Sequence, residues 1–335
     1  MQTEPDRKIR RKRIWKRLLA AALTMAVLYI AAVNVLVSAV LVPSFMEKLP
    51  SFERITRKSY AEQVQETELQ QNTQSLSAIG RGWSARENPQ ILHIRSEDGY
   101  RLAAAYFDKP GSHRWAVLLH GYTGSRSMMY EYGYWYSEHG YQVLVPDMRC
   151  QGESEGDYIG LGYTDSTDLV GWLGMILSMD PEAEVVLHGV SMGASAALIT
   201  AARDDLPVRL TAVIADCAYT DAYEMFRYKI GDWFHLPAFP VVDSASFFIR
   251  LRAGYSLREA SPLLAVHGSR VPTLFIHGKQ DKMIPPSMTV DLYRAAGCYK
   301  ELLIVADAGH AQCAAKVPEQ YFRRVETFIE RARQR

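Results

Sequence analysis

An apolar run, a glycine-flanked serine and an alanine-rich segment follow one another directly in the middle of this chain. Val185-Val186-Leu187 predicts a buried strand, and residues 194–202 predict a helix. Between them stands Gly189-Val190-Ser191-Met192-Gly193, a G-x-S-x-G pattern. On a sharp strand-to-helix turn, a serine is held with its hydroxyl exposed, and small flanking residues let strand and helix pack closely. The stretch therefore predicts an exposed nucleophilic serine; the alternative is an ordinary turn with a capping serine.

Strands and helices alternate from residue 91 to the C-terminus. Residues 91–95 and 101–107 flank Glu97-Asp98-Gly99, which is typical of a hairpin turn. Apolar runs predict further strands at 115–119, 142–147, 185–190, 210–216, 273–278 and 301–305. Intervening segments predict helices near 127–139, 165–177, 194–202 and 317–333. A hairpin followed by this alternation predicts an α/β fold: a mostly parallel central sheet with helices on both faces.

One segment, at about 219–264, breaks the alternation. It is rich in aromatic residues and contains Pro237 and Pro240. Insertions between sheet strands commonly cover active sites, so we interpret this segment as a helical cap. Some of its aromatic side chains are also expected to pack in the core.

The N-terminal part has the pattern of a membrane anchor. A basic tail, residues 1–17, precedes an apolar run over 18–42. As a helix this run would be about 37 Å long, more than the ~30 Å hydrocarbon core. Positive charge is concentrated before the run, which predicts a single-pass cell-membrane protein with a cytoplasmic N-terminus and an extracytoplasmic catalytic domain. We therefore expect an uncleaved transmembrane signal anchor.

Two alternatives to the anchor remain open. A cleavable signal peptide has a shorter apolar region, and Val37-Ser38-Ala39 weakly fits its small-residue exit. A buried core helix is disfavoured, because the run lacks a polar face and is preceded by a strongly basic segment. Residues 43–90 are interpreted as a juxtamembrane stalk. Their polar helical part, 53–76, is either part of the stalk or a helix packed on the domain. The α/β domain itself is expected at 91–335.

A serine nucleophile requires a base, and the base requires an orienting acid. His310 follows the last expected strand, at the carboxyl edge of the sheet where ligands bind. Asp281, in the loop after the preceding strand, is the preferred acid, and Asp216 and Asp307 are its rivals. Asp216 was also a candidate to support the cap. The order serine, acid, histidine is the order that this architecture uses.

Two backbone N–H groups are the expected oxyanion donors, those of Met192 and Tyr122. The Tyr122 hydroxyl is a weaker, additional candidate. Of the other histidines, His120 is expected to brace its loop and His188 to be a satisfied core residue, whereas His277 ends a strand.

Composition narrows the function classes. The 335 residues carry a net charge of +1, which gives no reason to expect a nucleic-acid partner. The four cysteines, Cys150, Cys217, Cys298 and Cys313, form no CxxC pair, so we expect separate, mostly buried thiols and no zinc site. No metal and no organic cofactor is implied.

With these residues placed, the chain resembles the α/β-hydrolase superfamily from about residue 91 onward. It looks most like the membrane-anchored bacterial hydrolases called serine-aminopeptidase-like or YqkD-like. The motifs that carry the resemblance are His120-Gly121-Tyr122-Thr123-Gly124, the run from Asp147 to Gly156, Gly189 to Gly193, His277 to Pro285, and Gly309-His310. The resemblance implies Ser191 as nucleophile, Asp281 as acid and His310 as base. Cys150 departs from it, because relatives usually carry a smaller residue there, commonly Gly or Ala.

The sequence therefore predicts a serine hydrolase that cleaves an ester or amide through an acyl-enzyme. The aromatic cap favours an apolar acyl or lipid-like substrate and carboxylesterase or lipase-like activity. Peptidase activity uses the same chemistry and is the first alternative. A noncatalytic surface-binding scaffold and an acyltransferase with a nonwater acceptor are the others. Fold resemblance defines mechanism better than substrate.

Overall fold

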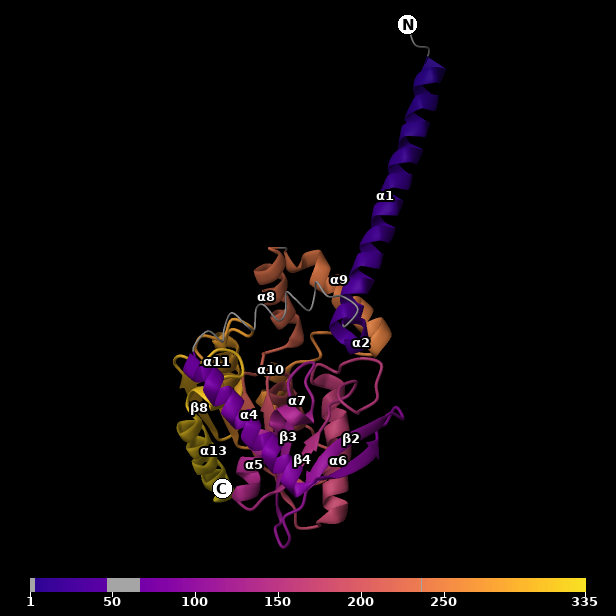
Figure 1. The fold of residues 1–335 in the computed structure, drawn as a ribbon. Coiled ribbons are helices and arrows are strands. Elements are labelled where there is room, and N and C mark those ends of the chain that lie inside the picture. Colours follow the sequence, from indigo (N-terminus) through magenta and orange to yellow (C-terminus); the bar gives the residue numbers. More distant parts are fainter. Residues whose placement is uncertain (1–3, 47–66, 236) are drawn as a thin grey trace.

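The computed structural model describes residues 4–46, 67–235 and 237–335. A central eight-stranded sheet is covered by helices on both faces, as predicted, and a long N-terminal helix projects away from this body (Figure 1). The strands are β1 (Gln90–Arg95), β2 (Arg101–Phe107), β3 (Arg114–Leu119), β4 (Gln142–Pro146), β5 (Glu184–Val190), β6 (Arg209–Asp216), β7 (Thr273–Gly278) and β8 (Lys300–Val305). The helices before β6 are α1 (Glu4–Leu41), α2 (Pro43–Met46), α4 (Thr67–Glu87), the 3₁₀ helix η1 (Arg126–Met129), α5 (Tyr130–Glu138), α6 (Tyr163–Met179) and α7 (Met192–Thr200). Those after it are α8 (Ala222–Phe234), α9 (Ala238–Ala253), α10 (Pro262–Gly268), α11 (Pro286–Ala295), α12 (Cys313–Lys316) and α13 (Pro318–Arg333).

The strand order is β1-β2-β4-β3-β5-β6-β7-β8. β2 pairs antiparallel with both β1 and β4, and every pair from β4 to β8 is parallel. The carboxyl ends of β3 to β8 therefore meet at one edge of the sheet. Loops from these ends carry the predicted site residues, so the topology brings segments far apart in sequence to one place.

Burial on both faces explains the continuous apolar runs of the central strands. In β3, Trp115, Val117 and Leu119 pack into one side of the core, and the alternate residues Ala116 and Leu118 pack into the other. Because strand side chains alternate between faces, a strand covered on both sides must be apolar throughout.

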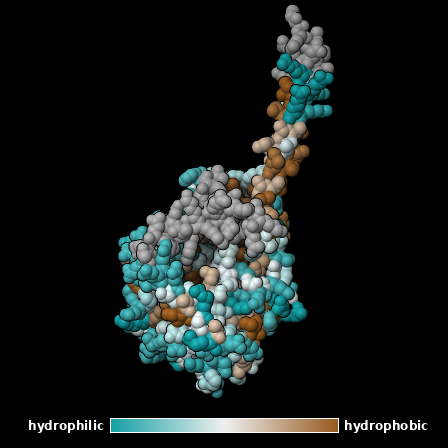
Figure 2. Space-filling model, in the orientation of Figure 1, coloured by the Kyte–Doolittle hydropathy of each residue, from teal (hydrophilic) through white to brown (hydrophobic). Residues whose placement is uncertain are grey.

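The end of α1 is part of the core of the α/β domain. Exposed apolar side chains follow α1 beyond its charged end (Figure 2). Farther along, Val33, Val37 and Leu41 are buried and join the core cluster. The backbone N–H of Ile159 donates to the Leu41 carbonyl at 2.9 Å. The last turns of α1 therefore pack in the domain core, and the rest of the helix projects from the domain. Among the described residues, it is the one helix long and apolar enough to span a membrane, at Lys12–Leu41.

Helix α4 packs against the domain, and its residues 67–76 overlap the predicted helix 53–76, of which residues 53–66 lie outside the described part. In the overlap, Leu69 is buried and the Asn72 side-chain amide donates to the Ala315 carbonyl at 3.1 Å, so these residues follow the second alternative, a helix packed on the domain. Trp83 is buried and stacks on Phe107 of β2, with ring centroids 4.0 Å apart. A Cβ atom added to Gly80 would lie 2.5 Å from the backbone nitrogen of Glu131 in α5. This part of the expected stalk is therefore attached to the domain, and the expected stalk residues 47–66 lie outside the described residues.

Three helices, α8, α9 and α10, stand between β6 and β7, where the cap was expected. We use "the cap" for α8 and α9. In Figure 1 these two helices lie on the side of the sheet from which α1 emerges. The Lys229 ammonium of α8 donates to the Lys282 carbonyl at 3.0 Å. The cap therefore contacts the loop that carries Asp281. Helices α10 and α11 were not predicted individually.

Candidate active site

Ser191 occupies the turn between β5 and α7 with φ 57° and ψ −117°. This is the left-handed side of φ space, which non-glycine residues adopt only when surrounding structure holds them there. The close backbone contacts of Gly189 and Gly193 show what holds Ser191 in this conformation. A Cβ atom on Gly189 would lie 2.3 Å from the Gly193 carbonyl carbon, and one on Gly193 would lie 2.2 Å from the Leu119 carbonyl oxygen. Only glycine permits this close approach of strand, helix and neighbouring loop.

Ser191, His310 and Asp281 form one hydrogen-bonded chain. His310 Nε2 lies 3.0 Å from Ser191 Oγ, and His310 Nδ1 lies 2.7 Å from Asp281 Oδ2. Asp281 follows β7 and His310 follows β8, so adjacent strands deliver the two groups to the serine. His310 Nδ1 must donate to the carboxylate, which leaves Nε2 as the acceptor for the serine hydroxyl.

Asp281 is buried, and donors hold its carboxylate on both oxygens. Oδ1 accepts the backbone N–H groups of Met283 and Ile284 at 2.7 and 2.9 Å. Oδ2 also lies 3.0 Å from His277 Nε2. Burial raises the pKa of Asp281, but the neighbouring His310 and His277 outweigh it and hold that pKa well below its usual range. The carboxylate therefore stays ionised and can orient an imidazolium.

His277 has a role beyond ending its strand, which the sequence analysis did not assign. Its Nε2 faces two acceptors, Asp281 Oδ2 and the Ile284 carbonyl, so this nitrogen carries the proton. Its Nδ1 lies 2.6 Å from Thr289 Oγ1 of α11. The four-residue spacing from His277 to Asp281 was visible in the sequence, but spacing within a loop does not define contact.

The loop after β3 passes directly beside Ser191. A Cβ atom on Gly121 would lie 3.5 Å from the Ser191 Cβ. Tyr122, the next residue, donates its hydroxyl to the Val40 carbonyl at the end of α1. In this structure the hydroxyl proton is therefore directed to a carbonyl and not toward Ser191. Met192 is the first residue of α7, where backbone N–H groups have no intrahelical acceptor.

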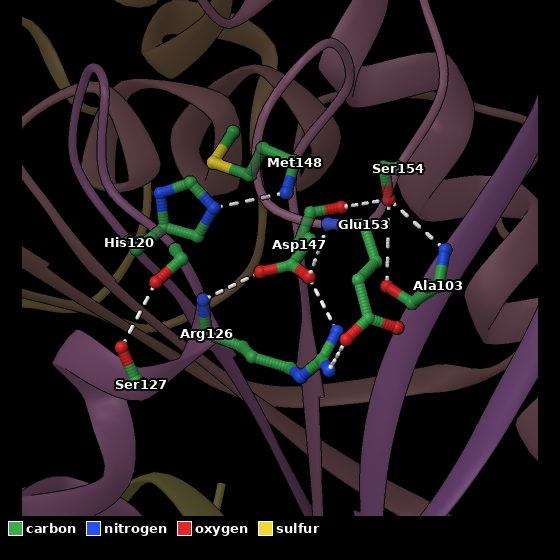
Figure 3. Close-up of polar contacts among 9 residues, drawn as sticks. Ala103, His120, Arg126, Ser127, Asp147, Met148, Glu153 and Ser154 are labelled. Carbon is green, nitrogen blue, oxygen red and sulfur yellow. Dashed lines mark hydrogen bonds and ion pairs between the residues drawn. The ribbon is translucent and has the colours of Figure 1, made fainter.

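Polar contacts connect the loop after β3 to the loop after β4 (Figure 3). His120 Nε2 accepts the Met148 backbone N–H at 2.9 Å, and its Nδ1 lies 2.8 Å from the Gly121 carbonyl. This confirms His120 as a brace of its loop, with the proton on Nδ1; burial lowers its pKa, which favours the neutral ring.

Arg126 and Asp147 complete the connection between these loops. Asp147 accepts the Arg126 backbone N–H at 2.7 Å and also pairs with its guanidinium. The Glu153 backbone N–H donates to the same carboxylate at 2.9 Å. Asp147 stood within a motif quoted above, yet its partner Arg126 had no sequence signal.

The rival carboxylates make other contacts, although the Asp216 backbone carbonyl accepts the Ser191 N–H at 2.8 Å. Asp216 is buried and accepts the Tyr321 hydroxyl of α13 at 3.0 Å, so its described contact is not with the cap. Burial raises the pKa of Asp216 to about 6. Asp307 is exposed. His188 is buried between two tyrosines, with Tyr136 Oη at 3.2 Å and Tyr321 Oη at 3.0 Å, which confirms it as a satisfied core residue.

All four cysteines are free thiols; Cys217 and Cys313 are buried and the other two half-buried. Cys217 lies near the serine site. Its sulfur, a carboxylate oxygen of Asp281 and a ring nitrogen of His310 all lie within 4.8 Å of one another. Both ring nitrogens of His310 already face Asp281 and Ser191. Burial raises the pKa of the Cys217 thiol well above its ordinary value. Cys150, the departure noted above, has φ 63°, a conformation in which glycine is unstrained.

The strand order and the serine turn define an α/β-hydrolase fold. The alpha/beta hydrolase family profile matches residues 116–324, and the chain belongs to this family. It is 30% identical over 238 residues to the uncharacterized protein YqkD of Bacillus subtilis strain 168, covering 71% of this chain and 78% of that one. It is 25% identical over 236 residues to the uncharacterized protein YfhR of Escherichia coli strain K12, covering 68% and 74%.

Solved structures show the same fold. The esterase Pf2001 of Pyrococcus furiosus superimposes with a TM-score of 0.59 at 22% identity, covering 74% of this chain and 95% of that one. An acylaminoacyl peptidase of Pyrococcus horikoshii superimposes with a TM-score of 0.53 at 20% identity, covering 72% of this chain and 40% of that one. These likenesses show the fold, and the family match supports a hydrolase.

Proposed function

We propose that this protein is a serine hydrolase that cleaves an ester or amide through an acyl-enzyme. The observation that carries the proposal is the hydrogen-bonded chain Ser191–His310–Asp281. In this mechanism His310 removes the Ser191 proton as the hydroxyl oxygen attacks the carbonyl carbon. The proton then passes from His310 to the leaving alcohol or amine. His310 next activates a water molecule, which releases the acid and restores the serine.

The oxyanion is held by the backbone N–H groups of Met192 and Tyr122. Met192 begins α7, and Tyr122 follows Gly121, whose backbone lies against Ser191. Donors placed where negative charge develops stabilise the transition state more than the substrate. The Tyr122 hydroxyl contact with Val40 supports this proposal, because it holds the loop that presents the N–H.

We infer carboxylesterase or lipase-like activity on an apolar acyl substrate, with peptidase activity as the second candidate. The aromatic cap beside the Asp281 loop supports the first. The two structural neighbours are an esterase and an acylaminoacyl peptidase, so the fold is consistent with either activity. Hydrolysis of esters of graded chain length, measured beside aminoacyl arylamides, separates them.

A fluorophosphonate probe tests the proposed nucleophile. We expect the wild-type protein to be labelled and Ser191→Ala to be unlabelled, since the probe reacts with activated serines. Ser195→Ala is the matched control, because Ser195 lies one turn further along α7 and is buried. Equal labelling of wild type and Ser191→Ala would overturn the assignment. A folded wild type that is neither labelled nor active on any ester would favour the noncatalytic scaffold.

We also propose that α1 is an uncleaved single-pass anchor with the basic end in the cytoplasm. Burial of Val33 and Val37 in the domain core supports retention of the helix, because cleavage after Val37-Ser38-Ala39 would remove both side chains. A protein tagged at both ends tests this: both tags should appear on one full-length membrane band, with only the C-terminal tag accessible from outside intact cells. A membrane-free band that has lost the N-terminal tag would indicate a signal peptide.

A further inference from the structure

The cap contacts α1 at a level where α1 is still apolar and exposed on its other side. Tyr29 of α1 and Ser244 of α9 lie 2.9 Å apart between their hydroxyl oxygens. Farther along, the Arg252 guanidinium of α9 donates to Ser38 Oγ at 3.0 Å and to the Asn34 carbonyl at 3.3 Å. Residue numbers increase in the same direction along both helices at these contacts, so each position on α9 can be related to a position on α1.

Helix length relates these positions to a bilayer. The basic residues of α1 end at Arg17, and a hydrocarbon core of ~30 Å needs about 20 helical residues. A span that starts at Leu18 therefore ends near Val37. Val35, close to that end, still exposes 49% of its surface. The Tyr29–Ser244 contact then lies about 8 residues, or ~12 Å, inside the far boundary of the hydrocarbon.

The outward face of α9 has the chemistry that this depth requires. Phe239, Phe247 and Leu251 expose 75%, 59% and 66% of their surfaces. Phe247 and Leu251 lie one turn apart on α9, and Phe239 lies at the kink near its start, where the backbone is not helical. A group of large exposed apolar side chains marks an interaction site. Phe247 and Leu251 lie between Ser244 and Arg252, at the levels of Tyr29 to Ser38, where the other face of α1 is apolar as well.

Polar side chains of α9 are satisfied within the protein. Before Arg250 they are three: Asp243 accepts the Tyr223 hydroxyl at 3.0 Å, Ser244 contacts Tyr29, and Ser246 accepts the Leu257 backbone N–H at 3.1 Å. Polar groups in hydrocarbon are tolerated when they have such partners.

The two arginines of α9 are at its end that contacts Asn34 and Ser38, near the calculated boundary. Arginine is favoured at a membrane interface, where its stem is covered and its charge is hydrated.

We propose that the outward face of α9, defined by Phe239, Phe247 and Leu251, lies in the bilayer leaflet on the catalytic-domain side, against α1. The proposed occupant of this face is lipid. The inference rests on the proposed anchoring of α1 and not on the proposed hydrolysis. It makes the cap a second membrane contact and places the serine site, whose neighbouring Tyr122 is bonded to the end of α1, next to the membrane surface.

Nitroxide side chains on the full chain in phospholipid vesicles test the proposal. Cysteine replaces one residue at a time, Leu28, Phe247 or Met179, in a chain whose half-buried Cys150 and Cys298 are serine. Leu28 is the reference for α1, being 58% exposed there. Met179 is the matched apolar control: it is 44% exposed and ends α6, near the amino ends of the parallel strands. Collision with oxygen, which concentrates in lipid, is compared with collision with a water-soluble nickel chelate.

We expect position 247 to resemble position 28, with oxygen collisions exceeding nickel collisions severalfold, and position 179 to show the reverse. Phe239→Cys provides a second site on the same face if Phe247→Cys does not fold. Position 247 resembling position 179 while position 28 remains in lipid would overturn the proposal. Nickel access at position 28 would overturn it together with the anchor. Fluorophosphonate labelling is measured separately, so failure of the hydrolase proposal is distinguishable from both outcomes.

Discussion

At the scale of single residues, the candidate site depends on which carboxylate reaches His310. Asp281 and Asp216 end neighbouring segments of the sheet edge, but only Asp281 lies within hydrogen-bond distance of the His310 ring. The difference comes from loop geometry after β7, where two backbone N–H groups orient the Asp281 carboxylate.

Asp281→Asn should lower kcat for ester hydrolysis by about 10³–10⁴-fold, because the amide neither orients the neutral ring correctly nor stabilises the imidazolium. Asp216→Asn is the control and should lower kcat by less than about tenfold. Steady-state kinetics with one soluble ester measure both. A larger loss in Asp216→Asn than in Asp281→Asn would exchange the roles of the two carboxylates.

Tyr122 offers a second test at this scale. Tyr122→Phe keeps the backbone N–H and removes only the hydroxyl that donates to Val40. We expect kcat to fall by less than about tenfold, which corresponds to the loss of one ordinary hydrogen bond. Loss of an oxyanion donor costs about 10²–10³-fold. A fall of that size would mean that the hydroxyl itself binds the oxyanion.

At the scale of elements, α4 extends the family fold on its N-terminal side. It precedes the residues that match the family profile, yet Trp83 is fully enclosed between α4, α5 and β2. This helix has only a thin apolar stripe, so its packing rests on a few large contacts.

Trp83→Ala should lower the free energy of unfolding by about 3–5 kcal/mol, the usual cost of removing a buried aromatic side chain. Ile79→Ala, on the same helix, is the matched control, because Ile79 is 45% exposed and should cost less than about 1 kcal/mol. Denaturant unfolding in detergent measures both. Equal, small costs would show that α4 is not a stabilising part of the domain.

At the scale of the whole molecule, several carboxyl groups are buried where ionisation is unfavourable. Burial raises the pKa of Asp165 to about 7, and Asp168 adds to the effect. Burial likewise raises the pKa of Glu131 to about 7. Each such group binds its proton more tightly in the folded state than in the unfolded one. Its contribution to stability is therefore present at low pH and is lost as pH rises toward the folded pKa.

Asp165→Asn should change this dependence. Its amide oxygen can still accept the Gly162 N–H, now 2.7 Å from the carboxylate, but it does not ionise. Between pH 5 and pH 8 we expect the variant to gain stability relative to wild type by up to roughly 3 kcal/mol, because the wild type loses about 1.4 kcal/mol per pH unit between pH 5 and the folded pKa. Thermal midpoints at both pH values measure the gain. Asp291→Asn, at an exposed position on α11, should show the same change in thermal midpoint between the two pH values as the wild type. If Asp165→Asn also shows the wild-type change, ionisation of Asp165 does not destabilise the folded protein.

Local sequence was sufficient for most of the fold. The predicted strand 273–278 coincides with β7, and the predicted helix 317–333 is α13 within one residue. Runs of β-branched residues and the apolar spacing of a helix act through contacts between near neighbours, so these elements could be predicted. The serine turn was predictable for the same reason, because Gly189 and Gly193 lie two residues from Ser191 and meet each other.

Tertiary structure decided what depends on distant segments. The Tyr122 hydroxyl contacts Val40, 82 residues away, and His310 contacts Ser191 across 119 residues. His310 could be proposed because the edge of a parallel sheet is a known meeting place, whereas no pattern relates Tyr122 to the end of α1. The sequence by itself therefore determined the strands, several of the helices, the serine turn and the apolar N-terminal helix. Packing alone decided that the end of α1 joins the core, because its buried face is defined by side chains that only the folded domain brings to it.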